Sequence, residues 1–179
     1  MKKSAFSIAV IALMTCIVII CSQIAIPFGG ILMTLQTFAI ALCGYILGIK
    51  GLTVIFVYLT LGAVGIPVFA GFGSSFAFLF GQTGGFLFGF LPLVFFCGLT
   101  AHIKSHIKTF LISLIGLFLC HAMGIFWFSI VSGNAIFPSF LLTSFPYLLK
   151  DLISLIFARI LTDKLRQRYP QLLFFRHLT

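Results

Sequence analysis

The sequence predicts an all-α integral membrane protein: a bundle of six transmembrane helices that forms one domain over residues 1–179, with both termini in the cytoplasm. Three observations lead to this fold class, namely the composition, the spacing of the apolar stretches and the placement of the basic residues. Apolar residues make up 61% of the chain and charged residues only 7%, whereas roughly 25% of a soluble domain is charged. Such a chain has too little polar surface to cover itself in water, so its apolar stretches must meet lipid.

The apolar stretches divide the 179 residues into six segments, which matches the room for about six spans of roughly 20 residues with short connectors. The Pro/Gly break "PFGG" (27–30) ends the first segment because it cannot continue a helix. Lys50 ends the second, and the third breaks near Pro67. The basic connector "HIKSHIK" (102–108) separates the fourth from the fifth, and the polar loop "SGNAIFPS" (132–139) precedes the sixth. The expected spans cover residues 5–26, 35–49, 51–69, 83–101, 109–131 and 144–162.

The basic residues determine the expected orientation. The chain has eleven lysines and arginines but only two acidic residues, which gives a formal net charge of +9. All the basic residues except Lys150 fall on one face of the alternating spans, and the positive-inside rule makes this face cytoplasmic. Proteins that bind nucleic acid cluster such residues on one solvated surface instead, so we expect no nucleic-acid partner. The residues of this face are Lys2, Lys3, Lys50, Lys104, Lys108, Arg159, Lys164, Arg166, Arg168 and Arg176.

Asp151 is the acidic residue that calls for an explanation. It lies about seven residues into the sixth span, or roughly 10 Å from the outer end of that helix. A buried aspartate costs roughly 2.5 to 3.5 kcal/mol at membrane depth, so we expect Asp151 to face a watered cavity that opens outward and to contact a ligand or an ion there. The alternatives are a structural ion pair with Lys150 or a lysine that extends toward the interface. Because adjacent helical residues point about 100° apart, we do not expect these two side chains to face each other well.

The glycine- and phenylalanine-rich segment after the third span predicts a lid over a hydrophobic pocket. Its glycines allow irregular backbone and close approach to a ligand, and its phenylalanines are too apolar for a solvated tether. Gln36, Gln82 and Thr83 add neutral polar groups at outer span ends, although each also fits a helix-end role. His121 stands alone in the fifth span, where we expect packing with one hydrogen bond; a position at the cavity is the alternative.

Motifs for enzymatic chemistry are not found in the sequence. It contains no HExxH, GxSxG or P-loop pattern and no glutamate, so we expect no enzyme, no cofactor and no metal site. If ATP drives a transport step, another subunit must supply the nucleotide-binding motif. Ala5 and Ala9 form a small-xxx-small pattern that lets another helix approach closely in lipid, although internal packing would use the same pattern.

Three runs of sequence, taken together, resemble the BioY family, the biotin-specific substrate-binding (S) components of energy-coupling factor (ECF) transporters. They are "MTLQTFAIALCGYILG" (33–48), "YLTLGAVGIPVFAGFG" (58–73) and "GQTGGFLFGF" (81–90). The similarity continues through "GIFWF" (124–128) to "PYLLKDL" (146–152), so it covers nearly the whole chain. The order LQTF, GxPVFAG and TGG is specific, although each alone is weak.

The resemblance implies a multi-pass protein of a prokaryotic plasma membrane, surrounded by lipid, whose outward pocket is closed by the loops after helices one and three. It implies biotin as the ligand, with a shared transmembrane subunit and two ATPase subunits as partners. It also implies that Asp151 contacts the ureido ring of biotin and that Ala5 and Ala9 dock the transmembrane subunit. The expected substrate-binding set is Gln36, Phe69, Gly71, Gln82, Thr83, Gly84, Gly85, Tyr147, Lys150, Asp151 and Ser154.

The chain departs from the family pattern next to Asp151. The family usually has glycine just before this aspartate and lysine three residues after it, where this chain has Lys150 and Ser154. Either Lys150 enters the site, or Ser154 forms a hydrogen bond while the positive charge serves elsewhere. The altered segment leaves two alternatives open, an S component for another small vitamin and a solitary biotin carrier.

Overall fold

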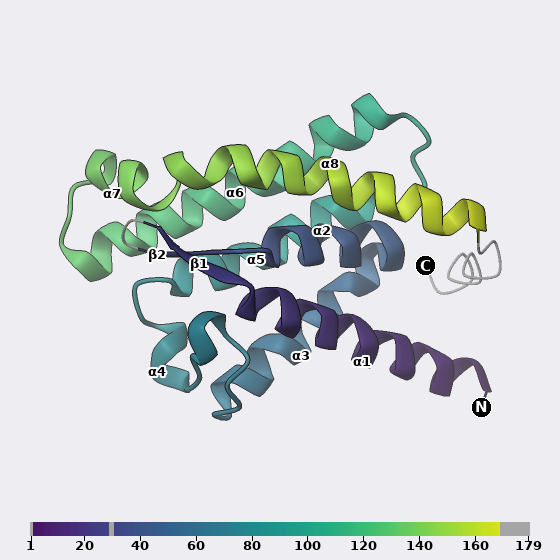
Figure 1. Ribbon diagram of the computed structural model, residues 1–179, viewed down its shortest axis with the longest axis horizontal. Helices are drawn as coiled ribbons and strands as arrows, with labels where there is room; N and C mark the ends of the chain where they lie inside the picture. Colours follow the sequence, from purple (N-terminus) through teal and green to yellow (C-terminus); the bar gives the residue numbers. More distant parts are fainter. Residues whose placement is uncertain (1, 29–30, 169–179) are drawn as a thin grey trace.

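The computed structural model describes residues 2–28 and 31–168, in which long helices pack side by side and short elements gather at one end (Figure 1). Gly29, Gly30 and the basic tail with Arg176 lie outside the described residues. The long helices are α1 (Lys2–Gln23), α2 (Gln36–Leu47), α3 (Gly51–Ala63), α5 (Gly84–Leu99), α6 (His106–Ser132) and α8 (Phe145–Arg168). The short elements are β1 (Ala25–Phe28), β2 (Ile31–Thr34), η1 (Gly48–Lys50), η2 (Ala70–Phe72), α4 (Phe76–Leu79) and α7 (Ile136–Thr143).

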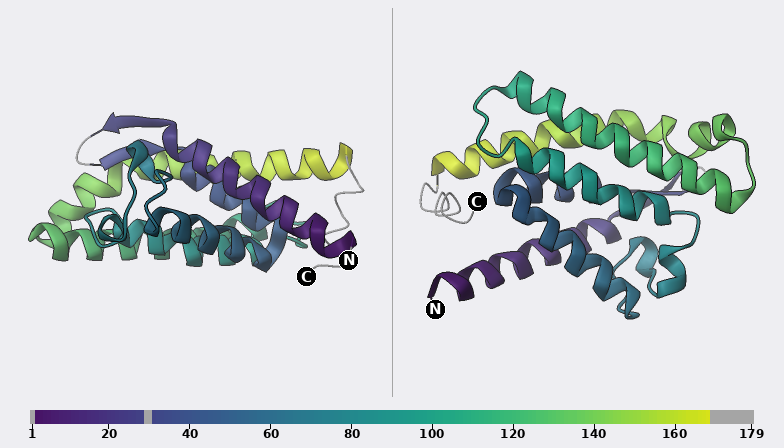
Figure 2. Two further views of the ribbon diagram at one scale, coloured as in Figure 1. Left: turned by 90° about the horizontal axis from the view of Figure 1, so that it is seen from below. Right: turned by 180° about the vertical axis from the view of Figure 1, so that it is seen from behind.

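The prediction of a helical multi-pass membrane protein is confirmed. Among the described residues, three helical stretches are long and apolar enough to cross a membrane alone: Ala5–Gln23, Gln36–Ala63 and His106–Ser132. The α7–α8 pair, bent by 50°, makes a fourth when it is counted as one span. Helix α5 is apolar but has only 16 residues, and α3 turns back from α2 at η1 (Figures 1 and 2). The number of six spans therefore stays a prediction.

The two ends of the bundle differ in charge. The start of α1, the α2–α3 turn, the α5–α6 connector and the end of α8 lie at one end of the molecule (Figures 1 and 2). We call it the basic end, because it carries Lys50, Lys104, Lys108, Lys164, Arg166 and Arg168. The hairpin of β1 and β2, α4 and α7 lie at the opposite end, the hairpin end. This arrangement places the start of α1 and the end of α8 at the same end of the bundle (Figure 1), and the cytoplasmic location of both termini stays a prediction.

Helices α1 and α3 end three or more residues earlier than the sequence analysis expects. Helix α1 stops at Gln23 because the following residues form β1, which pairs antiparallel with β2 from Ala25 opposite Thr34 onward. Helix α3 stops at Ala63 rather than at residue 69. Gly65 adopts a φ of 107° there, and Pro67 has no N–H to continue a helix. The chain between α3 and α4 is therefore irregular.

Helices α5 and α6 approach each other closely through glycines. A Cβ atom on Gly89 would lie 2.9 Å from the Cα atom of Cys120, and one on Gly85 would lie 2.3 Å from the Cβ atom of Trp127. A side chain at either position would therefore clash with α6, and glycine lets the two helix backbones approach closely in lipid. This close packing brings the inner faces of α5 and α6 to opposite sides of one narrow space.

At the basic end, arginines of α8 bind the ends of two other helices. Arg166 donates to the carbonyl oxygen of Ala101 at 2.6 Å and to that of Tyr45 at 2.5 Å. Arg159 donates to the carbonyl oxygen of Ile103 at 2.8 Å and pairs with Asp163 at 2.9 Å. Carbonyl groups at helix ends lack partners within the helix, so these contacts fix α8 against α2 and α5.

Candidate functional site

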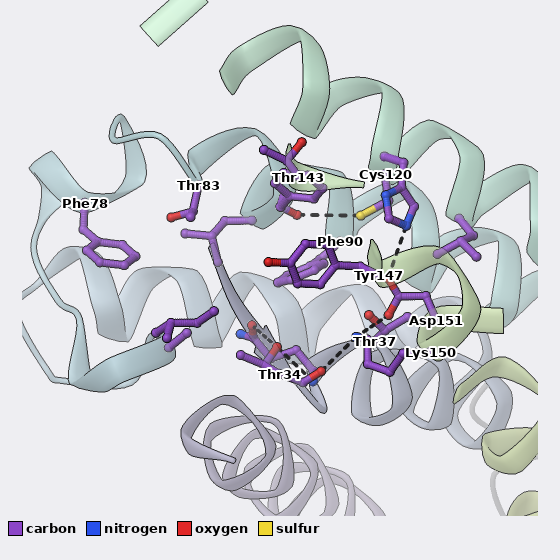
Figure 3. Close-up of a pocket in the computed structure, with 17 residues that line it drawn as sticks. Thr34, Thr37, Phe78, Thr83, Phe90, Cys120, Thr143, Tyr147, Lys150 and Asp151 are labelled. Atoms are coloured by element: carbon purple, nitrogen blue, oxygen red, sulfur yellow. Dashed lines mark hydrogen bonds and ion pairs between the residues drawn. The ribbon is translucent and has the colours of Figure 1, made fainter. Parts of the chain in front are cut away.

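A cavity lies in the half of the bundle nearer the hairpin end, between α2, α5, α6 and α8 (Figure 3). It encloses about 790 Å³ of space free of protein atoms, its open mouth included. Its walls come from eight elements, β2, α2, η2, α4, α5, α6, α7 and α8, and from Thr83 just before α5. Within the described residues it is lined by Leu32, Thr34, Gln36, Thr37, Ala70, Phe78, Thr83, Phe86, Leu87, Phe90, Leu117, Cys120, His121, Thr143, Tyr147, Lys150 and Asp151.

The polar wall of the cavity comes from the first turns of α8. Tyr147 and Asp151 are four residues apart, so they lie on one helix face, and both line the cavity. The Asp151 side chain is only 6% exposed, whereas that of Lys150 is 22% exposed and reaches the cavity from the flank. Ser154 lies on the same face of α8 one turn further in, where it is buried and does not line the cavity.

The Asp151 carboxylate contacts His121 and Lys150, and the Thr37 hydroxyl is a further hydrogen-bond partner. One oxygen, Oδ2, lies 3.2 Å from Nε2 of His121. The other, Oδ1, forms an ion pair with Nζ of Lys150. The expectation that Lys150 and Asp151 would not face each other is therefore wrong: the four-carbon stem of lysine lets its ammonium group fold back to the adjacent carboxylate.

Lys150 also connects α8 to the hairpin. Its Nζ atom donates a hydrogen bond of 2.8 Å to the carbonyl oxygen of Thr34, the last residue of β2 (Figure 3). The Thr34 hydroxyl donates to Oε1 of Gln36 at 3.0 Å, and Nε2 of Gln36 donates to the Tyr58 hydroxyl at 2.6 Å. A chain of polar contacts thus runs from Asp151 through the hairpin to α3.

The opposite wall is apolar. Helix α5 contributes Phe86, Leu87 and Phe90, and α6 contributes Leu117 and Cys120. Phe86 and Phe90 are four residues apart, and Leu117 and Cys120 are three apart, which places each pair on one face of its helix. A cavity with one carboxylate on a mainly apolar lining suits a small molecule that has hydrogen-bond donors at one end and hydrocarbon around them.

Comparison with known proteins shows the family. A profile of the BioY family matches residues 1–171. The chain belongs to the BioY family. Two similar relatives are a protein of Thermotoga maritima named "Biotin transporter BioY", 35% identical over 158 residues (86% of this chain and 91% of the relative), and one of Pyrococcus horikoshii named "Probable biotin transporter BioY", 32% identical over 160 residues (89% and 95%).

A solved structure shows the same fold. A crystal structure of the S-component for biotin from an ECF-type ABC transporter superposes with a TM-score of 0.84, covers 93% of each chain and is 24% identical in sequence. Together with the apolar helices, these relatives support a multi-pass location in the cell membrane.

The structure brings five of the expected site residues of this BioY protein to the cavity: Gln36, Thr83, Tyr147, Lys150 and Asp151. The other expected substrate-binding residues, Phe69, Gly71, Gln82, Gly84, Gly85 and Ser154, do not line it. Ala5 and Ala9, the expected docking residues, are both exposed on α1.

Two of the residues that do not line the cavity have clear packing roles. Phe69 is fully buried between two rings, edge-on to Tyr58 at 5.4 Å and stacked on Phe78 at 5.3 Å. Since Phe78 lines the cavity, Phe69 supports the wall from behind. A Cβ atom on Gly84 would lie 1.9 Å from the carbonyl oxygen of Leu79. The close approach that Gly84 permits is therefore to the backbone of Leu79 and not to a ligand.

The sequence analysis missed His121 as a partner of Asp151, along with the hydroxyl groups of Thr34, Thr37 and Thr143 at the cavity. One signal pointed to the histidine. Ionisable residues within membrane spans usually pair with one another, and His121 and Asp151 are two such residues on different spans. Sequence does not tell whether their helix faces meet in a BioY protein.

Proposed function

We propose that this BioY protein is the membrane-embedded biotin-binding component of an ATP-driven vitamin uptake transporter. It captures biotin from the outer side of the membrane in the cavity beneath the 70–82 segment. The single observation that carries the proposal is the buried Asp151 carboxylate, which lines a mainly apolar cavity. The names of the relatives, which are biotin transporters, support the choice of ligand.

The chemistry of biotin matches this cavity. Its ureido ring presents two N–H donors, and the remainder of its fused rings is hydrocarbon and sulfur. An ionised carboxylate offers about four acceptor sites, so Asp151 keeps acceptor capacity beyond its contacts with His121 and Lys150. Charge-assisted hydrogen bonds of this kind are roughly twice as strong as neutral ones, and the aromatic wall of Phe86 and Phe90 suits the apolar face of the rings.

The expected route of entry lies at the hairpin end. Leu32 and Thr34 of β2 line the cavity on one side, and Ala70 and Phe78 of the 70–82 segment line it on another. We assign the basic end to the cytoplasm by the positive-inside rule, so the cavity mouth faces outward. Separation of the hairpin from the 70–82 segment would then admit biotin, and their approach would close the site.

The energising machinery comes from partner subunits in this proposal. The sequence contains no nucleotide-binding motif. In this proposal two ATPase subunits hydrolyse ATP, and a shared transmembrane subunit couples the hydrolysis to transport. Ala5 and Ala9 on α1 provide the surface for the transmembrane subunit, because small exposed residues four apart let a second helix approach closely.

A biotin titration of the purified protein tests the ligand assignment. We expect Asp151→Asn to weaken biotin binding by about 1.5 to 3 kcal/mol, as for the loss of a hydrogen bond to a charged group, which is roughly 10- to 150-fold in Kd. Asp163→Asn is the matched control, because Asp163 pairs with Arg159 at the basic end. An unchanged affinity in Asp151→Asn would remove this carboxylate from the site.

The altered KDLIS segment keeps two alternatives open, a component for another small vitamin and a solitary biotin carrier. Titration with a panel of vitamins tests the first, since tighter binding of another vitamin than of biotin would replace biotin as the ligand. Uptake of radiolabelled biotin by cells that express the chain with and without the ATPase subunits tests the second. We expect uptake to require the ATPases.

A further inference from the structure

His121 joins three parts of the molecule. Its side chain is 8% exposed, and each ring nitrogen has a protein partner. Nε2 lies 3.2 Å from Oδ2 of Asp151 on α8, and Nδ1 lies 2.9 Å from Oγ of Ser144 at the α7–α8 junction. The ring also packs edge-on against Phe86 of α5, with centroids 5.9 Å apart and planes at 86°. The imidazole is therefore held on three sides.

The contacts of His121 define which partner each ring nitrogen faces. An ionised carboxylate can only accept hydrogen bonds, so Nε2 carries the proton that is donated to Asp151. At the other nitrogen, Nδ1, the Ser144 hydroxyl is a suitable partner whether or not Nδ1 carries a proton, since a hydroxyl can both donate and accept. Ser144 is itself fixed, because its N–H donates to the carbonyl oxygen of Phe140 at 3.0 Å in the bend of 50° between α7 and α8.

The second partner of Asp151 is less rigidly placed. The Lys150 side chain is 22% exposed, whereas that of His121 is 8% exposed, and a lysine stem has four rotatable bonds whereas the imidazole has two. Of these two partners, His121 therefore restricts the orientation of the carboxylate more, with Thr37 as a further hydrogen-bond partner. That orientation decides which acceptor sites of Asp151 point into the cavity.

We propose that His121 is a positioning residue for Asp151 and, through it, determines selectivity for the donor pattern of the ligand. The inference rests on the proposed function, because it concerns the same carboxylate. Ser144 orients His121, His121 orients Asp151, and Asp151 then presents acceptor sites at a defined angle to the two N–H groups of a ureido ring. A ligand whose ureido nitrogens are methylated cannot use this arrangement.

The alternative is that His121 serves packing alone. It also borders an apolar groove on the outer side of the bundle, together with Leu148 of α8 and Phe140 of α7. A residue in such a wall can stabilise the bundle without any influence on the ligand. The test must therefore separate the hydrogen bond to Asp151 from the volume of the ring.

Two substitutions test the hydrogen bonds of the two His121 ring nitrogens one at a time. The amide of His121→Gln reaches about as far as Nε2 and can still donate to Asp151, whereas the shorter amide of His121→Asn reaches the Nδ1 position and Ser144. We expect His121→Gln to keep biotin Kd within about threefold of wild type, and His121→Asn to weaken binding roughly tenfold, because it loses the bond to a charged group. Equal losses in both variants would support packing alone and overturn the inference.

A double-mutant cycle provides the second measurement. His121→Leu removes both hydrogen bonds and keeps an apolar side chain; we expect a loss of roughly tenfold in biotin affinity. In the Asp151→Asn background the same change should cost no more than about twofold, since coupled residues are not additive. The ratio of affinities for biotin and for N-methylated biotin should also fall in His121→Leu. Additive losses with an unchanged ratio would overturn the inference.

Controls keep this result distinct from a failure of the proposed function. Tyr45→Phe removes a buried hydrogen bond of 2.9 Å to Ser113, also on α6, but Tyr45 does not line the cavity, so biotin affinity should stay unchanged. If wild type does not bind biotin, the proposed function fails. If wild type binds biotin and Asp151→Asn weakens it while His121→Asn and His121→Leu bind like wild type, only the role of His121 is refuted.

Discussion

At the scale of single residues, the two aspartates of the described chain show how the environment gives two chemically identical side chains different roles. Asp163 is 23% exposed and pairs with Arg159 one helical turn away at the basic end. Asp151 is 6% exposed and contacts a histidine and a lysine beside a cavity. The first contributes to helix packing, and the second retains acceptor capacity toward space that a ligand can enter. Depth in the membrane makes this difference, because an acceptor in an apolar cavity gains more from each donor.

The position of Lys150 leads to a prediction about the two residues that depart from the family pattern. We expect Lys150→Met to weaken biotin binding by at least roughly tenfold, because it leaves the buried Asp151 charge without its ion-pair partner. Ser154→Ala should change Kd by less than about twofold, since Ser154 does not line the cavity. Isothermal titration of both purified variants measures this. The reverse order of effects would return Ser154 to the site and remove Lys150.

At the scale of secondary-structure elements, the end of α1 holds both segments that border the cavity mouth. The Leu35 N–H, just after the hairpin, donates to the carbonyl oxygen of Cys21 at 3.2 Å. Gln23 donates from Nε2 to the carbonyl oxygen of Phe69 at 3.0 Å, and its Oε1 accepts from the Phe72 N–H at 3.0 Å. Movement of the hairpin or of the 70–82 segment is therefore coupled to the last turn of α1.

This arrangement predicts that Gln23→Ala loosens the segment that contains Phe72 without unfolding the bundle. Each lost hydrogen bond contributes about 0.5 to 1.5 kcal/mol, so amide exchange of residues 69–73 should accelerate roughly tenfold or more by local opening. Hydrogen–deuterium exchange with mass spectrometry measures the change. Gln82→Ala is the matched control, because Gln82 is exposed in the same region. Equal exchange in wild type and Gln23→Ala would show that other contacts hold the segment.

At the scale of the whole molecule, the cavity and the arginine contacts of α8 lie in different halves of the bundle. The cavity lies toward the hairpin end, and the arginine contacts that fix α8 to α2 and α5 lie at the basic end. Helix α1 runs between the two ends (Figure 1). Its last turn holds the segments at the cavity mouth, and its first turns expose Ala5 and Ala9. One helix thus connects the proposed ligand site with the proposed docking surface.

The separation predicts that assembly can be blocked without loss of ligand binding. We expect Ala9→Leu to leave biotin affinity within about twofold of wild type and to abolish co-purification with the transmembrane subunit, because the added bulk keeps the helices apart. Ala77→Leu is the matched control, since Ala77 is exposed on α4 at the hairpin end. Intact co-purification of Ala9→Leu would place the docking surface elsewhere.

The sequence alone determined the class of the protein, the order of its main helices and the importance of Asp151. These follow from composition, from the length of apolar stretches and from the cost of a charge at membrane depth, all of which are properties of the chain itself. The boundaries were less certain: α3 ends at Ala63 and a β-hairpin follows α1, because local backbone pairing competes with helix continuation where glycine and proline occur.

Only the tertiary structure decided which side chains surround Asp151. His121 stands 30 positions earlier in the sequence, and it meets the carboxylate because the glycine-rich contact between α5 and α6 fixes where α6 lies and which of its faces turns inward. Tertiary packing also places Phe69 and Gly84 against other protein atoms and brings the Lys150 ammonium group to β2. The spacing of residues shows which side chains share a helix face. Which residues that face contacts depends on the orientation of the neighbouring helices and on the distance between them.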